Sequence, residues 1–368
     1  MPMLSRLPCV LFLMQFLLLP AWAEQAYEVE TVVEGLEHPW SLAWLPDGRM
    51  LVTERAGRLR LIEDDELNPE PVGGVPEAHV HSQAGLFEVV PAPDFADTGH
   101  IYLSLASGSR RANTLLVVRA RLDGHSLVDV EEVFRARPAR STSVHYGGRM
   151  LFLPDGTLLI TVGDGFDYRE QAQDLSNHFG TIVRLNPDGS APDNNPFTNR
   201  PDSLAEIYTY GHRNIQGIVH DAESNRLWTS DHGPRGGDEL NRIQPGLNYG
   251  WPAVTHGVDY SGARITPFTE LSGMESPELV WTPAVAPSGL ALYRGDLFPD
   301  WEGNLLVGGL VARSVGRILL DDGSATDHEM LFGELNRRIR DVRIGPDGAI
   351  YLLTDHVDGR ILRVLPSD

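Results

Sequence analysis

Apolar residues along this chain recur in short stretches, and no long segment shows helical periodicity. The recurring unit is an apolar stretch, then Pro-Asp-Gly, then a stretch in which apolar and polar residues alternate. The unit occurs with Pro-Asp-Gly at 41–54, 147–164 and 340–355. It occurs in a looser form, without Pro-Asp-Gly, at 84–106, 215–233 and 288–310. Asp-Gly and Asn supply the positive φ that tight hairpin turns need, so each copy predicts a β-hairpin. The alternation predicts that the second strand of each hairpin turns one face toward a neighbouring sheet.

Six related hairpins predict an all-β protein with the architecture of a six-bladed β-propeller. They recur roughly every 50 to 70 residues, a spacing typical of propellers and solenoids. A β-sandwich that carries unrelated Pro-Asp-Gly turns is the alternative, and the number of related copies argues against it. No linker is evident, so one domain is expected over 24–368. Its segments at 165–212 and 233–287, rich in Gly, Asn, Asp and Pro, are expected to be functional loops.

The first 23 residues have the composition of a secretory signal peptide. Arg6 provides the positive start, 10–20 the apolar run, and Ala21-Trp22-Ala23 the A-x-A cleavage site. A membrane anchor is the alternative, but a spanning helix needs about 20 apolar residues. We therefore expect a periplasmic protein without stable membrane insertion, whose mature chain begins near Glu24.

The cysteine content and the net charge narrow the possible functions further. The single cysteine, Cys9, lies in the predicted signal peptide, so the mature chain has no disulfide, thiol nucleophile or thiolate metal site. The formal net charge of −21 disfavours binding to nucleic acids and anionic membranes, which require basic surfaces. The same charge is compatible with bound cations.

A histidine and an aspartate flank the strands of the repeat near the middle of the chain. His145 precedes this repeat and Asp164 ends it, so a hairpin would place both at the same end of a blade. Histidine is the side chain most readily held near neutral pH as a general base, and a carboxylate can orient its ring. A purely structural hydrogen bond is the alternative for an isolated histidine at a strand start.

Two arginine-containing clusters also fall at the ends of repeats. Arg213 offers a planar fork for a carboxylate or an oxyanion, and Asn214 can bridge two polar groups. Strand alternation places Arg338 and Arg340 on one face, where their charges repel unless an anion lies between them. The pair predicts a carboxylate-rich ligand. Surface ion pairs and a blade-to-blade salt-bridge network are the alternatives for the two clusters.

A segment rich in Gly, Pro and acidic residues, 231–241, has the composition of a calcium site. Gly and Pro expose backbone carbonyls, and carboxylates follow closely, which suits the irregular oxygen coordination of Ca²⁺. The segment does not match an EF-hand loop. His79 and His81 would share a strand face, but no third ligand is evident nearby, so a zinc site is not expected there.

Seven motifs, in this order, resemble the soluble PQQ-dependent sugar dehydrogenases: HSQAGL, HYGGRMLFLPDG, GDG, YGHRNIQG, DHGPRGGDELN, NYGWP and RIRDVRIGPDG. The chain is similar, from about Tyr27 to Val364, to the aldose sugar dehydrogenase branch of the glucose/sorbosone dehydrogenase family. That resemblance implies a six-bladed propeller that binds pyrroloquinoline quinone (PQQ) and Ca²⁺ at its central face. It also implies oxidation of the C1 hydroxyl of an aldose sugar to a lactone, with electrons passed to a soluble or membrane-bound acceptor.

The resemblance implies a role for each matching residue. His145 would be the proton acceptor, Asp164 would support it, and Arg213 with Ca²⁺ would polarise the quinone. The residues that would contact the cofactor are Gln83, Arg213, Asn214, Arg338 and Arg340. The backbone carbonyls of Gly233 and Pro234 would hold the Ca²⁺ beside the cofactor. A second, structural Ca²⁺ would be held by Glu239 and the backbone of Tyr249.

One position departs from the pattern of the family. Its VGSLK-type segment usually carries a lysine near the quinone, but this chain reads VGGLVARS, with Val311 at that position. Arg313, two residues on and expected on the same strand face, would supply the missing cation. A relative that binds no cofactor is the alternative if it does not.

Two other functions compete with the dehydrogenase. A calcium-dependent lactonase on the same propeller would use Ca²⁺ as a Lewis acid and would not need the pair Arg338 and Arg340. A non-catalytic binding module is the second alternative, because propellers are common interaction scaffolds and a fold does not fix a function.

Overall fold

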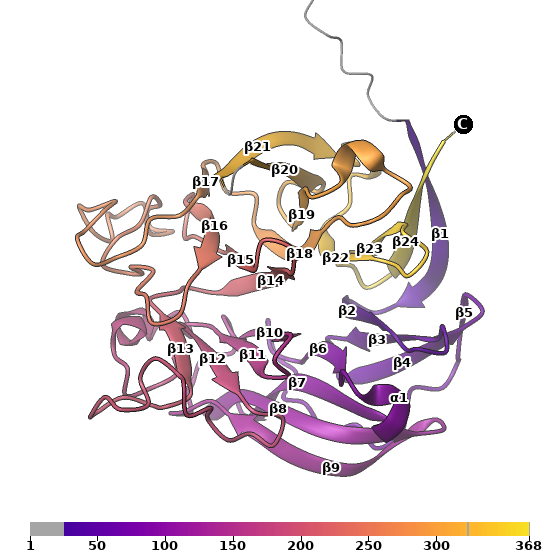
Figure 1. Cartoon of the computed structure of the whole chain (residues 1–368), viewed down its shortest axis with the longest axis horizontal. Helices are drawn as coiled ribbons and strands as arrows, with labels where there is room; N and C mark the ends of the chain where they lie inside the picture. The colour runs from indigo at the N-terminus through magenta and orange to yellow at the C-terminus, as the bar shows by residue number, and fades with distance from the viewer. Residues whose placement is uncertain (1–25, 322–323, 368) are drawn as a thin grey trace, which may run out of the picture.

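The computed structural model describes residues 26–321 and 324–367, so the predicted signal peptide lies outside the described residues. Within these ranges the chain forms 24 β-strands in six four-stranded antiparallel sheets. The sheets surround a common centre as blades (Figure 1), which confirms the predicted all-β, six-bladed propeller. Among the same residues, no helix combines the length and the apolar composition that a membrane crossing requires.

Five blades consist of four consecutive strands each, and the first strand of each blade is the innermost. Blade 1 contains β2 (Pro39–Trp44), β3 (Met50–Glu54), β4 (Arg58–Glu63) and β5 (Glu66–Leu67). Blade 2 contains β6 (Leu86–Pro91), β7 (His100–Ser109), β8 (Ala112–Asp123) and β9 (Ser126–Arg135). Blade 3 contains β10 (Gly147–Phe152), β11 (Leu158–Val162), β12 (Thr181–Leu185) and β13 (Ile207–Tyr210). Blade 4 contains β14 (Ile215–Asp221), β15 (Arg226–Asp231), β16 (Asp238–Ile243) and β17 (Leu279–Trp281). Blade 5 contains β18 (Pro287–Leu292), β19 (Leu305–Gly309), β20 (Val315–Asp321) and β21 (Ser324–Leu331).

The sixth blade joins the two ends of the described chain. Its three inner strands are β22 (Ile339–Ile344), β23 (Ile350–Thr354) and β24 (Gly359–Pro366). Its outermost strand is β1 (Tyr27–Leu36), which lies beside β24 in Figure 1 and pairs with it antiparallel. The first strand therefore completes the last blade, and backbone hydrogen bonds close the ring. The short helices of the described chain are α1 (Phe95–Thr98), η1 (Arg169–Gln173), η2 (Pro299–Trp301) and η3 (Gly333–Leu335).

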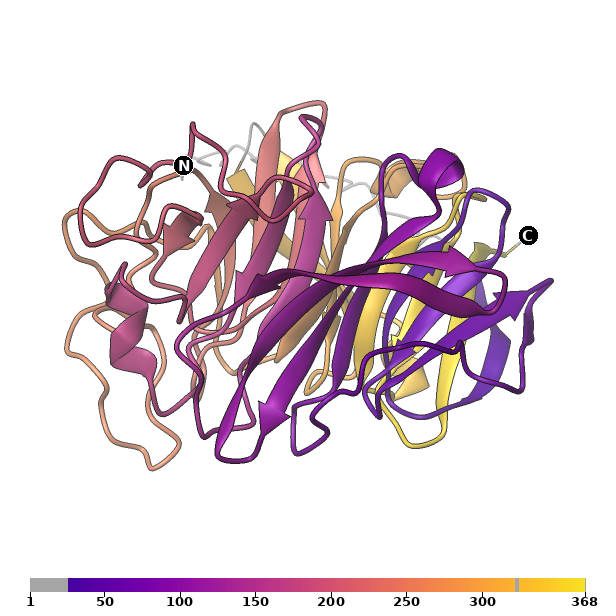
Figure 2. The ribbon, with the colours of Figure 1, turned by 90° about the horizontal axis from the view of Figure 1, so that it is seen from below.

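The innermost strands line the centre of the ring. The strands β2, β6, β10, β14, β18 and β22 contact one another in that order, and β22 contacts β2. Each innermost strand, together with the strand that follows it, is one of the six hairpins predicted from the repeat. The connections after β11 and β16 lie side by side beyond the sheets (Figure 2), where Arg169 pairs with Asp259 at 3.2 Å.

The Pro-Asp-Gly turns of the three repeats at 41–54, 147–164 and 340–355 share one backbone conformation. In each turn the glycine N–H donates to the carbonyl oxygen three residues earlier, at 2.9 to 3.0 Å. The glycines Gly48, Gly156 and Gly348 have φ between 78° and 90°, where a residue with a Cβ is strained. Pro-Asp-Gly therefore predicts these hairpins because its glycine adopts the positive φ that the turn requires.

The burial of the second strands differs from the expectation drawn from their alternation. Every residue of β3, β11 and β23 is buried, on both faces of the strand. Each blade is packed between two neighbours, so both of its faces are covered. The polar residues of these strands consequently lie in the interior and need partners there.

A buried cluster of charged side chains joins the blades at the centre of the ring. Arg149 of β10, which is 2% exposed, pairs with Glu88 of β6 and Asp341 of β22, each at 3.0 Å. Its guanidinium also lies 4.0 Å from the centre of the Trp40 ring. Arg343 pairs with the same two carboxylates. Two guanidinium groups and two carboxylates thus balance in charge, as burial away from water requires.

We expect Arg149→Met to destabilise the protein by about 3 to 5 kcal/mol, because Glu88 and Asp341 would remain buried with one cation instead of two. Urea denaturation followed by tryptophan fluorescence measures this loss. Arg135→Met is the matched control, because Arg135 pairs with Glu132 on the surface, and its loss should cost less than about 1 kcal/mol. Equal stability of the two variants would contradict the central role of Arg149.

Candidate active site

His145 and Asp164 form a buried pair at one end of blade 3. His145 precedes β10, Asp164 follows β11, and the pairing of Gly147 with Val162 brings the two segments together. The Nδ1 atom of His145 lies 2.7 Å from Oδ1 of Asp164. The other carboxylate oxygen, Oδ2, accepts a hydrogen bond from Trp251 Nε1 at 2.8 Å. The carboxylate therefore fixes the orientation of the imidazole ring.

The backbone of His145 is held in an unusual conformation. Its φ of 53° lies in the left-handed region, which is uncommon for a residue with a side chain. Gln83 Oε1 accepts its N–H at 2.9 Å, and Arg140 Nη1 donates to its carbonyl oxygen at 3.0 Å. A Cβ at Gly163 would lie 2.1 Å from that same oxygen, so only glycine fits there. Such local strain, held by several partners, is typical of functional sites.

The pair has defined charge states near neutral pH. Burial lowers the pKa of His145, although the charge of Asp164 and the hydrogen bond between them oppose this effect. Burial alone would raise the pKa of Asp164, but His145 and Arg213 outweigh it, and the pKa is lowered. Because the ionised carboxylate only accepts hydrogen bonds, Nδ1 of His145 carries the ring proton. Nε2 is therefore free to accept a proton.

Asp231, at the end of β15, holds the loop that carries Arg213 and Asn214. Its two carboxylate oxygens accept the N–H groups of these residues at 3.0 and 2.6 Å. Burial raises the pKa of Asp231 to about 7. The guanidinium of Arg213 donates to the carbonyl oxygens of His232 and Gly233 at 2.9 and 2.7 Å. Arg213 is thus buried beside the His–Asp pair and points toward the loop after β15.

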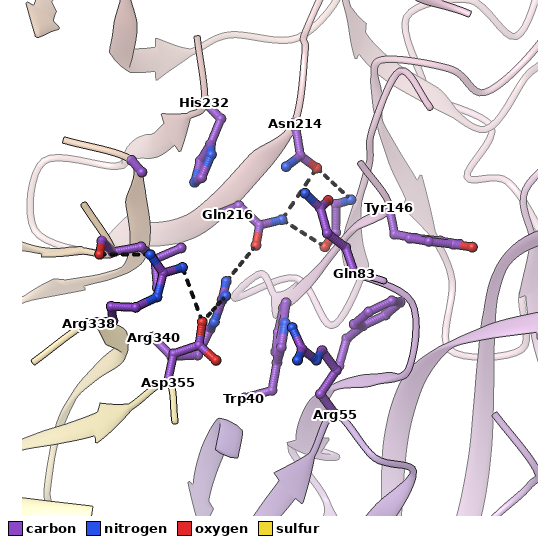
Figure 3. A pocket seen from close by; sticks show the side chains of 14 residues that line it. Trp40, Arg55, Gln83, Tyr146, Asn214, Gln216, His232, Arg338, Arg340 and Asp355 are labelled. Carbon is purple, nitrogen blue, oxygen red and sulfur yellow. Dashed lines mark hydrogen bonds and ion pairs between the residues drawn. The ribbon is translucent and has the colours of Figure 1, made fainter. Parts of the chain in front are cut away.

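A first cavity opens at the centre of the ring (Figure 3). It contains four of the predicted cofactor residues, Gln83, Asn214, Arg338 and Arg340. Arg55, Arg338 and Arg340 bring three guanidinium groups to its wall, and Asp355 brings one carboxylate. His232 also lines it, and burial lowers the pKa of this histidine to about 3, so the ring is neutral. The charged side chains at the wall therefore leave an excess of positive charge, which favours an anionic ligand.

The polar groups of the first cavity include unused donors and acceptors. Gln83 and Asn214 use their amide oxygens on the N–H groups of His145 and Gly147. Within the described chain, their NH₂ groups donate no hydrogen bond, and Nε2 of His232 is buried without a partner. The aromatic rings of Trp40, Phe87 and Tyr146 complete the wall. This combination suits a flat, anionic ligand with several oxygen atoms.

A second cavity adjoins the His–Asp pair at Asp164. Asp164, Arg213 and Trp251 line it together with residues from the two long connections after β11 and β16. Phe166 and Tyr260 are stacked at its wall, with ring centres 6.2 Å apart. Asp167, Arg169 and Asp259 add polar groups that can bind hydroxyls. His145 is 5% exposed and lies between residues of the first cavity and residues of the second.

The predicted arginine pair meets around Asp355 and not on an open strand face. Arg338 lies before β22 begins, and the register of β22 with β23 is irregular between Ile339 and Asp341. Both guanidinium groups nevertheless reach Asp355 Oδ2, at 3.4 Å from Arg338 and 2.9 Å from Arg340. An anion does lie between the arginines, and it is a carboxylate of the same blade. The pair still retains one net positive charge for a ligand.

Arg313 does not lie where its predicted role requires. Residues 311–313 form the turn between β19 and β20, so the prediction of a shared strand face was wrong. Arg313 is exposed, donates to Asn336 at 3.1 Å, and does not line the first cavity. Val311 is 60% exposed and lines a third, mainly apolar cavity with Pro234 and Tyr260. Neither residue brings a cation to the first cavity.

The predicted calcium residues differ in how well they suit a cation. The carbonyl oxygen of Gly233 already accepts a hydrogen bond from Arg213, so the described arrangement of Gly233 and Pro234 does not fit a Ca²⁺. Burial and the charges of Asp231 and Asp238 raise the pKa of Glu239 to about 8. In the described ranges, no three His, Cys, Asp or Glu side chains are grouped to hold a metal, and no described contact joins Glu239 to Tyr249.

Several residues of the site lie outside the motifs that the sequence presents. Those outside the seven motifs are Trp40, Arg55, Arg140 and Asp355. Gln216, His232 and Trp251 lie within the motifs, but the sequence assigned them no role. One available signal is the acidic residue at the end of the second strand of a repeat. Glu54, Asp231 and Asp355 share this position, and each binds a group that precedes the innermost strand of its own blade. Asp164 does the same with His145.

The oriented histidine and the cationic central cavity of the closed propeller suit an enzyme that binds an anionic ligand. The chain belongs to the glucose/sorbosone dehydrogenase family, because the sequence model of that family, described as Glucose / Sorbosone dehydrogenase, matches residues 36–363. It is 40% identical over 354 residues to the aldose sugar dehydrogenase YliI of Escherichia coli, covering 94% of this chain and 95% of the relative.

Solved structures agree with this assignment. The soluble aldose sugar dehydrogenase from Escherichia coli, in its apo-form, superposes with a TM-score of 0.89 at 41% identity, covering 93% of this chain and all of that one. The PQQ-bound form of aldose sugar dehydrogenase from Streptomyces coelicolor gives a TM-score of 0.77 at 30% identity, covering 93% of this chain and 99% of that one. The protein is thus an oxidoreductase of the sugar dehydrogenase type.

We expect the pKa of His145 to lie below the ordinary value of 6.5, because burial disfavours the charged ring. Asp164→Asn should lower it further, because the carboxylate is the largest influence that raises it. Histidine ring resonances followed by NMR against pH measure this, with His145 assigned by its loss in His145→Gln. Asp123→Asn, at an exposed carboxylate, is the control and should leave the curve unchanged. A His145 pKa at or above 6.5 would contradict the described geometry.

Proposed function

We propose that this protein is a PQQ- and Ca²⁺-dependent dehydrogenase that oxidises the C1 hydroxyl of aldose sugars to lactones and passes the electrons to an external acceptor. The observation that carries this proposal is the position of His145. Its Nε2 is free to accept a proton, its backbone N–H bonds Gln83 of the cationic first cavity, and its ring bonds Asp164, which lines the second cavity. The relatives named above, one of them solved with PQQ bound, support the choice of cofactor and substrate.

The residues of the first cavity suit PQQ, which carries three carboxylates on a flat ring system. Arg338 and Arg340 would bind carboxylates, and the unused NH₂ groups of Gln83 and Asn214 would bind carbonyl or carboxylate oxygens. His232, with its unpartnered ring nitrogen, lies at the same wall. When bound, PQQ would supply the chemistry of a two-electron hydride acceptor.

His145 would act as the base in this reaction. An alcohol that loses a hydride from C1 must also lose the proton of its hydroxyl group. Nε2 of His145 can take that proton, because Nδ1 is committed to Asp164 and the ring is neutral near pH 7. Asp164 would then stabilise the positive charge that forms on the ring.

Arg213 would place a fixed positive charge next to the reacting groups. Its guanidinium lines the second cavity, lies 5.3 Å from the centre of the Trp251 ring and is 4% exposed. A buried cation of this kind stabilises negative charge that develops on an oxygen, and it does so without reorganisation. Phe166 and Tyr260 would offer aromatic faces to the sugar ring, while Asp167 and Asp259 would accept hydrogen bonds from its hydroxyls.

A Ca²⁺ would bind at Glu239. Glu239 is a buried carboxylate whose neighbours Asp231 and Asp238 are also acidic, and in the described chain its only side-chain partner is Asn241, at 3.1 Å. A cation would offset the charge of this group. At Gly233 and Pro234 a Ca²⁺ would require Arg213 to leave the Gly233 carbonyl.

The site of action would be the periplasm, because the first 23 residues have the composition of a signal peptide. The N-terminal sequence of the protein purified from periplasmic extract tests this directly. A mature chain that begins near Glu24 agrees with export, whereas an intact Met1 in the cytoplasmic fraction contradicts it.

We expect the purified protein to bind PQQ in the presence of Ca²⁺ and then to reduce a dye when an aldose is added. His145→Ala should keep its affinity for PQQ but lose about 10²- to 10⁴-fold in kcat, the usual contribution of a general base. Absorbance titration measures PQQ binding, and dye reduction measures turnover. His220→Ala is the matched control and should retain full turnover, because His220 lies near the end of β14 and bonds Asn225 in an exposed contact.

The competing functions predict different results in the same assays. Lactone hydrolysis with Ca²⁺ alone would identify a lactonase, and the absence of both activities would favour a binding module. Failure to bind micromolar PQQ would rule out the dehydrogenase. Near-normal turnover of His145→Ala would show that another group acts as the base.

Calcium should raise the melting temperature of the wild-type protein, because a bound cation stabilises the folded state only. Glu239→Gln should lose part of this rise, since it removes the charge of the proposed ligand. Glu66→Gln, at an exposed position on β5, should behave as wild type. Melting curves recorded with added Ca²⁺ and with a chelator give the comparison, and an undiminished rise in Glu239→Gln would exclude Glu239 as a ligand.

A further inference from the structure

Arg55 is the one cation at the wall of the first cavity that has no partner of its own in the described chain. Arg338 and Arg340 both reach Asp355, but no hydrogen bond or ion pair engages the guanidinium of Arg55. Figure 3 shows Arg55 beside Trp40, on the opposite side of the cavity from Arg338. The side chain is half-buried, and the sequence motifs do not include it.

The electrostatic surroundings of Arg55 are unfavourable as long as the cavity holds only protein groups. Burial lowers the pKa of Arg55, the charge of Asp355 opposes this, and the charges of Arg340 and Arg338 lower it further. Asp355 is already shared by the other two guanidinium groups and by His38 at 2.7 Å. A third guanidinium next to two others, with one carboxylate among them, lacks a counter-charge. An anion in the cavity would supply it.

Backbone hydrogen bonds on both sides of Arg55 fix the position of this residue in the fold. Its N–H donates to the carbonyl oxygen of His38 at 3.1 Å, and its own carbonyl oxygen accepts the N–H of Leu86 at 3.3 Å. A Cβ at Gly85 would lie 1.9 Å from this oxygen, so the close approach depends on glycine. Blades 1 and 2 therefore hold Arg55 at the rim of the cavity from both sides.

We propose that Arg55 is the third cation of the cofactor site and binds a carboxylate of PQQ. This proposal rests on the proposed function. Arg55 would supply the positive charge that relatives provide with a lysine at the position of Val311. Val311 and Arg313 do not line the cavity, whereas Arg55 reaches it from the turn between β3 and β4. Three guanidinium groups would then face three carboxylates, with Asp355 holding two of the guanidinium groups in place.

The test compares Arg55→Gln, Arg55→Met and the control Arg111→Gln in titrations with PQQ at saturating Ca²⁺. Quenching of tryptophan fluorescence reports binding without turnover, because Trp40 lines the cavity. We expect both Arg55 variants to bind PQQ about 10- to 100-fold more weakly, as expected for loss of a charge-assisted contact. Arg111 is exposed in the turn between β7 and β8, and Arg111→Gln should bind as wild type.

Two further measurements separate ligand binding from a structural role. The trimethyl ester of PQQ lacks the three negative charges, so the difference between wild type and Arg55→Gln should shrink with this probe. The ligand-free melting temperature of Arg55→Gln should equal or exceed that of wild type, because the substitution removes charge repulsion and breaks no internal bond. A structural role would instead lower the melting temperature.

The possible outcomes lead to distinct conclusions. Wild-type affinity for PQQ in both Arg55 variants would overturn the inference and leave the proposed function intact. An undiminished loss with the trimethyl ester, or a lower melting temperature without ligand, would also overturn it. A wild-type protein that does not bind PQQ would overturn the proposed function, and the role of Arg55 with it.

Discussion

The position of Arg149 at the centre of the ring is the constraint on which both the fold and the site depend. Its side chain pairs with carboxylates of β6 and β22, and it donates to the carbonyl oxygens of Gln216 and Arg340 at 2.7 and 3.2 Å. Gln216 and Arg340 also line the first cavity. The contacts that hold four blades together therefore also fix two residues that line the first cavity. In the cluster around Arg149 the charges balance, whereas at the wall of the first cavity positive charge is in excess.

The hairpin repeat supplies the site with carboxylates as well as with structure. Acidic residues lie at or within two residues of the ends of β3, β11, β15 and β23, and each binds the segment that enters its own blade. At Asp231 the partner is a pair of backbone N–H groups, at Asp164 it is an imidazole ring, and at Asp355 it is two guanidinium groups. A similar contact thus holds a loop in blade 4 and orients the histidine of the His–Asp pair in blade 3.

The parts of the molecule that follow from local chemistry were predictable from the sequence. Pro-Asp-Gly turns and strand-like stretches are local, so the hairpins could be counted and the ring inferred, and residues next to strands, such as His145 and Asp164, could be placed at a shared end. Contacts that cross blades were not predictable, because no local pattern records that Arg149 reaches Glu88. The conformation of the short turn between β19 and β20 was not predictable either. Residues 311–313 look like a continued strand in sequence, and the turn directs Arg313 away from the cavity.

The pairing of β1 with β24 has a consequence for the order of events during synthesis. The strand at 27–36 is made long before its partner at 359–366, so this blade stays incomplete until β24 has been synthesised. Contacts between residues so far apart in sequence form late and slowly. The ring can therefore close only after the other five blades have been synthesised.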